Sequence, residues 1–306
     1  MAKERIEIEE LEELAPREVL KAEVNLLLFP CFVLSNQEMR KRRATIFRTL
    51  ITQGDKVMEL LWQVTGSQRW GHPGPFDKMV FRAIEMLIQK RGYPVKNPVT
   101  FSTYEICKLM GKTKSGWLYE RIHQSLDRIA ATTIKTKGTF YRKKKRDYWA
   151  EGTFHLYDMV YTQGQTLPNG DIADRNYVYL SKIYRESLNA QYVRPLDWDY
   201  YRSLERPLSQ RLYEILGVKF YGALHQNSLT VRYKYDTLCQ LLPIARKPFL
   251  SQATQQLQLA HKELIDTEFL DSVRWEGWTI YYNAGQRAID EIESLGQGQG
   301  FLSLSS

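Results

Sequence analysis

One stretch in the N-terminal half restricts the fold of this chain more than any other. A short apolar-periodic segment, Phe101–Leu109, precedes a polar turn, Gly111–Gly116, and a longer amphipathic segment, Trp117–Ile129. Thr103 and Ser115 are typical helix N-caps and Gly111 lets the backbone turn, so the stretch predicts two consecutive helices. The second helix should bury one face, because apolar residues recur there at helical spacing: Leu118, Ile122, Leu126 and Ile129.

Two segments rich in β-branched and aromatic residues follow, Thr132–Tyr141 and Tyr148–Tyr161, and they predict a two-stranded hairpin. The tip of this hairpin is a run of five cations: Arg142, Lys143, Lys144, Lys145 and Arg146. Two helices and a basic hairpin are typical of a helix-turn-helix with a wing, which places one helix in the major groove of DNA. A solvated charged turn is the alternative interpretation of the tip.

A second, weaker copy of this plan lies between residues 229 and 283. Its predicted elements are a strand, a helix pair and a hairpin: Leu229–Tyr233, Tyr235–Leu242, Phe249–Ile265, Phe269–Trp275 and Trp278–Asn283. The order helix, strand, helix, helix, hairpin therefore occurs twice, without a repeat of individual letters. The predicted fold class is α+β with two tandem winged-helix domains.

The predicted domains follow from this plan and from changes in composition. They are an acidic arm at 1–22, an N-terminal winged-helix domain at 23–165, a linker at 166–176, a C-terminal winged-helix domain at 177–296 and a flexible tail at 297–306. Before the first helix pair we expect a charged helix, an extended segment and two paired strands: Glu7–Ala22, Glu23–Leu34, Ala44–Gln53 and Lys56–Thr65. A further helix should end at Gly92.

The charge of the chain is segregated along its length. The net charge is +8 and the sequence pI is near 9.2, which favours a polyanionic partner without specifying one. The segment Glu4–Glu13 is acidic, whereas Lys135–Arg146 contains no acid. A hydrophobic content of 43% excludes a wholly disordered chain. Such segregation suits a surface that faces a phosphate backbone.

The cysteines and the N-terminal segment indicate the cellular compartment in which the protein is expected to work. Cys31, Cys107 and Cys239 are far apart and lack a CxxC pair, so we expect buried free thiols and no metal site. Met1–Glu13 lacks the apolar core of a signal peptide, and Leu26–Leu34 is too short to span a bilayer. The expected location is the cytoplasm, with no membrane partner.

Candidate DNA contacts fall on both helix pairs. In the first module the hairpin tip is one group of candidates. The others lie in the turn, on the second predicted helix and on the next strand: Lys112, Lys114, Arg121, Gln124, Arg128 and Lys137. In the second module they cluster at the start of the longer helix: Arg246, Lys247, Ser251, Gln252, Gln255 and Gln256. We expect base contacts from five of these: Arg121, Arg128, Gln252, Gln255 and Gln256. Ordinary solvated helix faces are the alternative.

Signals for catalysis are weak. The histidines are dispersed, with no HExxH spacing, and no phosphate-binding GxxxxGK[ST] motif is present. Asp197 and Asp199 resemble paired carboxylates, but a helix N-cap is the simpler interpretation. We expect no catalytic centre and no cofactor.

Several motifs, in order, resemble the replication initiator protein A family of bacterial plasmids. The resemblance covers about residues 23 to 283 and lies in Thr103–Ile106, Gly111, Tyr119–Arg121, Leu126–Ile129, Thr153–Leu156, Asp197–Leu204, Pro207–Tyr213, Ala260–Ile265 and Phe269-Leu270. It implies tandem winged-helix domains without a catalytic centre that bind repeated duplex sites at a plasmid origin. It also implies melting of an adjacent AT-rich segment, recruitment of the host replicative helicase and chromosomal initiator, and homodimers that inhibit initiation.

Two other functions fit the same residues. A transcriptional repressor would use the same two modules on the same grooves of DNA. An accessory or scaffold protein of a mobile element would use them for protein contacts, and a nuclease is a remote third possibility.

Overall fold

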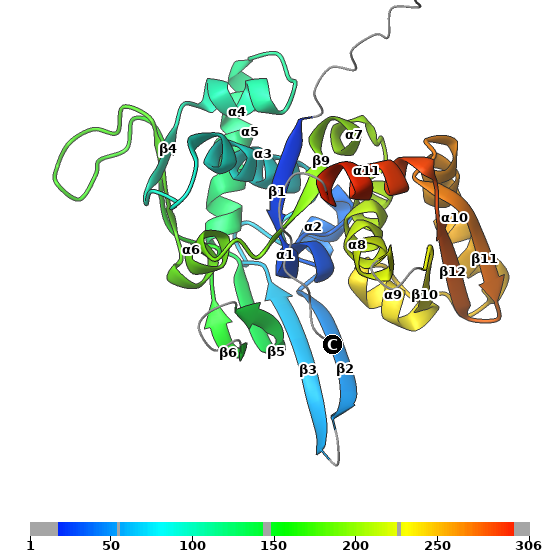
Figure 1. Cartoon of the computed structure of the whole chain (residues 1–306). Coiled ribbons are helices and arrows are strands. Elements are labelled where there is room, and N and C mark those ends of the chain that lie inside the picture. Colours follow the sequence, from blue (N-terminus) through cyan, green and yellow to red (C-terminus); the bar gives the residue numbers. More distant parts are fainter. Residues whose placement is uncertain (1–17, 54–55, 143–147, 225–227, 297–306) are drawn as a thin grey trace, which may run out of the picture.

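The computed structural model describes residues 18–296 except 54–55, 143–147 and 225–227. Within this range the strands form four antiparallel sheets, and helices separate them (Figure 1). Buried side chains from both halves of the chain belong to one continuous hydrophobic core, in which Trp62, Phe81, Trp198 and Tyr282 are fully enclosed.

The same arrangement of elements occurs twice. The first unit comprises α3 (Pro75–Arg91), β4 (Val99–Phe101), α4 (Thr103–Leu109), α5 (Gly116–Ala130), β7 (Tyr157–Tyr161) and β8 (Asn176–Leu180). The second comprises α8 (Pro207–Leu224), β10 (Thr230–Lys234), α9 (Tyr235–Leu241), α10 (Leu250–Asp266), β11 (Leu270–Glu276) and β12 (Thr279–Ala284). Their sheets have equivalent orders, β4-β8-β7 and β10-β12-β11, so the strand between the first two helices pairs with the last strand in each unit.

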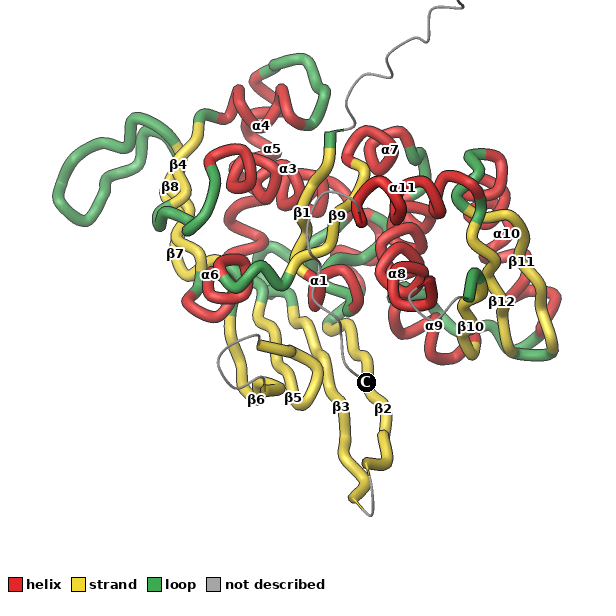
Figure 2. The backbone as a smooth tube through the Cα atoms, viewed as in Figure 1, coloured by secondary structure: helices red, strands yellow, loops and turns green. Residues whose placement is uncertain are grey.

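The two strands of the predicted basic hairpin do pair with each other, but they belong to a separate four-stranded sheet and not to the sheet of the first unit. β5 (Thr133–Arg142) and β6 (Tyr148–Phe154) join β2 (Ala44–Gln53) and β3 (Lys56–Thr65) in the order β2-β3-β5-β6. The pairing of β2 with β3 is as predicted, but the expected strand over 148–161 breaks at His155-Leu156. β6 then stays in this sheet, while β7 enters the sheet of the first unit (Figure 2).

Buried aromatic rings explain why β5 pairs with β3 and β6 pairs with β5. The Trp62 ring on β3 stacks on Phe140 of β5 at 6.3 Å, and Phe140 meets Phe154 of β6 edge-on at 5.2 Å. Trp62 and Phe140 are fully buried, so this register encloses both rings. Local sequence predicts the strands but contains no signal for which distant strand they join.

The predicted linker also lies elsewhere in the fold. Residues 162–175 connect β7 to β8, and the loop is closed by Ala173 N–H donating to the Gln165 carbonyl at 2.8 Å. A segment between two neighbouring strands of one sheet cannot separate two modules. The chain instead crosses between the units through α6 (Lys182–Asn189), β9 (Val193–Asp197) and α7 (Trp198–Ser203).

The N-terminal elements are the reverse of those predicted. Residues 19–23 form a strand, β1 (Val19–Glu23), and α1 (Val24–Leu28) occupies the segment expected to be extended. The Glu23 carboxylate caps α1 by accepting from the Leu26 N–H at 2.8 Å. β1 pairs with β9, which places the N-terminal strand between the two units (Figure 1). The predicted helix over 7–17 lies outside the described residues.

The first helices of the two units are joined by a buried ionic cluster. Glu214 on α8 forms an ion pair with Lys78 at 2.7 Å and accepts from Arg82 at 3.0 Å, and both cations lie on α3. Arg211 lies 3.1 Å from Glu214 and also donates to the Leu27 carbonyl of α1 at 2.7 Å. Burial alone would raise the pKa of Glu214, but Lys78 and Arg82 hold that pKa at about 2. The cluster therefore remains charged inside the protein.

We predict that Glu214→Ala destabilises the fold by about 3–5 kcal/mol, because it leaves buried cations without their carboxylate. Urea unfolding followed by circular dichroism measures this change. Glu205→Ala is the control, since the Glu205 side chain is 83% exposed, and it should change stability little. Equal effects of the two substitutions would contradict a structural role for the cluster.

Candidate nucleic-acid interface

The helix pair of the first unit is built largely as its residues predict. Ser115 caps α5 by accepting from the Leu118 N–H at 3.2 Å, and the predicted apolar stripe of α5 is buried. Gly111 has φ +66°, the left-handed conformation that the turn requires. One cap is corrected: Ser102, not Thr103, caps α4, in a reciprocal pair with Glu105. The polar caps and the apolar stripe together fix the orientation of α5.

Arg128 holds α5 against α3 instead of facing outward. Its Nη1 donates to Asp77 Oδ1 at 2.6 Å and its Nε donates to the Trp70 carbonyl at 2.9 Å, and the side chain is 14% exposed. The same Asp77 oxygen accepts from Ser125 Oγ at 2.6 Å. Burial raises the pKa of Asp77, and Arg128 opposes that rise. The guanidinium predicted to contact bases is thus already engaged in packing.

A groove lies beside α5, between this helix and α2 (Asn36–Lys41). Its volume is about 600 Å³, and its lining includes Arg40 and Lys41 from α2 and Arg121 from α5. The lining acid is Asp77, which Arg128 neutralises. The groove is therefore a positively charged channel of a size suited to an extended polyanion.

Arg121 is held in this groove by aromatic rings. Its guanidinium carbon lies 3.9 Å from the ring centroid of Phe76 and 4.6 Å from that of Trp117, which is 67% exposed. It makes no hydrogen bond or ion pair with any residue that the structure describes. Stacking fixes the plane of the guanidinium and leaves its N–H groups available, an arrangement typical of phosphate or base recognition.

The basic segment of α2 is absent from the residues predicted to contact DNA. Residues 40–43 are four consecutive cations, a visible signal. Arg42 forms a 2.6 Å ion pair with Glu38, four residues earlier. Arg40, Lys41 and Arg43 are exposed. The sequence alone does not show that tertiary packing places this run opposite α5.

The remaining candidates of the first module are dispersed. Lys112 and Lys114 are exposed in the turn before α5. Gln124 donates to Glu120 Oε1 at 2.9 Å, so an acid shares the outer face of α5. Lys137 lies on β5, 3.7 Å from Glu59, in the four-stranded sheet and not beside α5. Arg142 ends β5, and Lys143–Arg146 lie outside the described residues.

The candidates of the second module separate into two groups. Gln256 is internal to the turn, because it accepts from Tyr235 OH at 2.6 Å and donates to the Ala245 carbonyl at 3.1 Å. Arg246 pairs with Asp236 and stacks over Trp278 at 4.8 Å, and the Lys247 N–H donates to Tyr235 OH. Ser251, Gln252 and Gln255 are exposed on α10. The side chains of this last group make no hydrogen bond or ion pair with a described residue, so they are available to contact a ligand.

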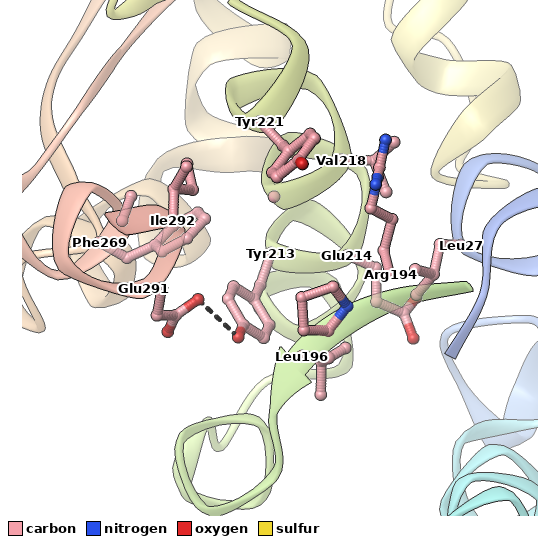
Figure 3. Close-up of a pocket in the computed structure, with 13 residues that line it drawn as sticks. Leu27, Arg194, Leu196, Tyr213, Glu214, Val218, Tyr221, Phe269, Glu291 and Ile292 are labelled. Atoms are coloured by element: carbon pink, nitrogen blue, oxygen red, sulfur yellow. Dashed lines mark hydrogen bonds between the residues drawn. The ribbon is translucent and has the colours of Figure 1, made fainter. Parts of the chain in front are cut away.

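Another cavity, between α8, β9 and α11 (Gln286–Gly296), is part of the packing (Figure 3). Tyr213 OH donates to Glu291 Oε2 at 3.0 Å, and Arg194 stacks on Tyr221 at 3.9 Å. Its volume of about 30 Å³ is enough for water and not for a larger ligand. The three cysteines are buried free thiols, as predicted.

We predict that Arg128→Ala lowers stability by about 2–3 kcal/mol, because it leaves Asp77 buried without its cation. Arg121→Ala should cost less than about 1 kcal/mol, the value of a partly exposed stacking contact. A double-mutant cycle between Arg128 and Asp77, read by thermal unfolding, should show coupling. Additive effects would mean that the two side chains do not hold α5 in place.

Two solved structures and one family model are similar to this chain, whereas no curated protein sequence matches it. Among solved structures, crystals of selenomethionine derivatives of domain 2 and domain 3 of RctB match with a TM-score of 0.51 and 14% identity. That match covers 85% of this chain and 98% of the other. A second structure of RctB domains 2-3 has a TM-score of 0.43 and 15% identity, covering 88% and 98%.

The RctB match bears on the fold alone, which is mixed α and β. In the part of the chain that is described, each helix is too short or too polar to cross a bilayer. The family model for replication initiator protein A matches residues 21–234, well over half of the chain. The chain therefore belongs to the replication initiator protein A family, which supports a role in the initiation of DNA replication.

Proposed function

We propose that this chain is a plasmid replication initiator that binds repeated duplex sites at an origin through two winged-helix modules. The support for the modules is the element order that occurs twice with equivalent strand orders, β4-β8-β7 and β10-β12-β11. In each module the second helix of the pair, α5 or α10, is the recognition helix. The wing of the first module is the connection between β7 and β8, residues 162–175, and not the basic tip at 142–146.

The observation that carries the proposal is the groove between α2 and α5. A helix in the major groove has a sugar-phosphate backbone on each side of it. Arg40, Lys41 and Arg121 converge on the groove beside α5, where one backbone would pass. The exposed Lys112 and Lys114 stand near the start of the same helix. Such contacts fix position and provide salt-dependent affinity, while base contacts provide the choice of sequence.

Origin opening and recruitment of host proteins are the later steps of the proposed function. β5 and β6, which flank the basic segment 142–146 in the sequence, belong to a different sheet from β4, β7 and β8, so this segment would contact a separate stretch of phosphates. The initiator would open an adjacent AT-rich segment and recruit the host replicative helicase and chromosomal initiator. It would do so without a catalytic centre of its own, and homodimers would limit initiation.

Selection of bound duplexes from a random library by the full-length chain tests sequence-specific binding. We expect enrichment of one site, and enrichment of none would reject the proposal. On the selected site, Arg40→Ala/Lys41→Ala should reduce the slope of log affinity against log salt by about 1.8, the value for two lost phosphate contacts.

The matched control is Lys96→Ala/Lys182→Ala, which removes the same charge from exposed positions outside the groove. It should leave the salt slope nearly unchanged. A slope that is equally reduced by both double variants would show that general charge, and not the groove, determines binding.

A further inference from the structure

The outer face of α10 is chemically unlike that of α5. From Leu250 to Lys262 the helix contains no acid, and its first full charge is Lys262. The face of α5 instead includes Glu120 and Asp127. Exposed side chains on α10 recur at spacings of three, four and three: Gln252, Gln255, Leu259 and Lys262. They form one stripe along the helix, which we call the α10 stripe.

The two glutamines of the α10 stripe have unused amides. Neither Gln252 nor Gln255 makes a hydrogen bond with a described residue, whereas the neighbouring Gln256 is bonded on both sides of its amide. A free carboxamide presents a donor and an acceptor in one plane. That pattern matches the N6 donor and N7 acceptor of adenine in the major groove.

Leu259 is the unusual member of the α10 stripe. It is 59% exposed, lies between Gln255 and Lys262, and is not part of the buried face formed by Ala253, Leu257 and Leu264. The major-groove edges of the base pairs offer one apolar group, the C5-methyl of thymine. A leucine one turn along from an adenine-reading glutamine is placed to cover the methyl group of an A·T pair.

We propose that α10 reads A·T base pairs, with Gln252 and Gln255 on adenine and Leu259 on a thymine methyl. This inference rests on the proposed function, since it assigns chemistry to a recognition helix. The second module therefore selects an A·T-containing half-site, whereas the first module binds the phosphate backbone through the cations beside α5. Gln256 takes no part in reading, because its amide belongs to the turn between α9 and α10.

Deoxyuridine substitution tests the thymine contact, because it removes only the C5-methyl. The full-length chain is titrated against a duplex recovered from a random library and against the same duplex with every thymine replaced. The wild type should bind the substituted duplex about fourfold more weakly for each methyl that it covers. Leu259→Ala should bind both duplexes equally, and Leu259→Met, which keeps an apolar side chain, should retain the discrimination.

Ile265→Ala is the matched control, because Ile265 is an exposed apolar residue on another side of the same helix. This variant should bind the deoxyuridine duplex more weakly than the thymine duplex, by the same factor as the wild type. The inference would be overturned if the wild type bound the thymine and deoxyuridine duplexes equally, or if Leu259→Ala still bound the deoxyuridine duplex more weakly. Either result would assign Leu259 to contacts with another protein. A chain that binds no duplex would instead reject the proposed function, so the two failures are distinct.

The adenine contact has its own probe, 7-deazaadenine, which lacks the N7 acceptor. Wild-type binding should weaken when adenines in the selected duplex are replaced, and Gln252→Ala/Gln255→Ala should reduce this sensitivity. Gln258→Ala is the control, because Gln258 is exposed on α10 outside the stripe. Unchanged sensitivity in the double variant would contradict the reading of adenine by these amides.

Discussion

The buried carboxylate of Glu214 determines how the two units are held together. It lies on α8 and binds Lys78 and Arg82 on α3, and these helices begin the two repeated arrangements. A third cation, Arg211, connects the same carboxylate to the carbonyls of α1. Charges withdrawn from water are tolerated only when partners surround them, so this geometry allows little sliding of α3 on α8. The buried ionic cluster, together with apolar packing, consequently sets the separation of α5 from α10.

The two helices proposed to read DNA, α5 and α10, differ in their supports and in their exposed side chains. α5 is attached to α3 by Arg128 and Asp77, and its neighbour α2 supplies cations across a groove. α10 buries Ala253, Leu257 and Leu264 and exposes a stripe of amides with one leucine. The first surface suits phosphates and the second suits base edges. Under the proposed function, the first module would supply affinity and the second would supply sequence choice.

Much of the local structure was predictable from sequence, because caps and periodicity act over a few residues. The paired strands at 44–65, the Ser115 cap and the buried stripe of α5 follow from such signals. Long-range pairing was not predictable. The basic hairpin joined β3 because buried aromatics such as Trp62 select partners far apart in the chain. The segment predicted as a linker became the β7–β8 connection. Likewise, sequence presents Arg121 and Arg128 as equivalent cations, and only packing shows that Arg128 is bound to Asp77.

In the proposed function both units bind one duplex at the same time. Hydroxyl-radical footprinting of the full-length chain on its selected site measures this directly. We expect two protected tracts, with centres about one helical turn of 10–10.5 base pairs apart, as for two recognition helices in consecutive major grooves. A single protected tract, or equal protection of an unrelated duplex, would contradict it.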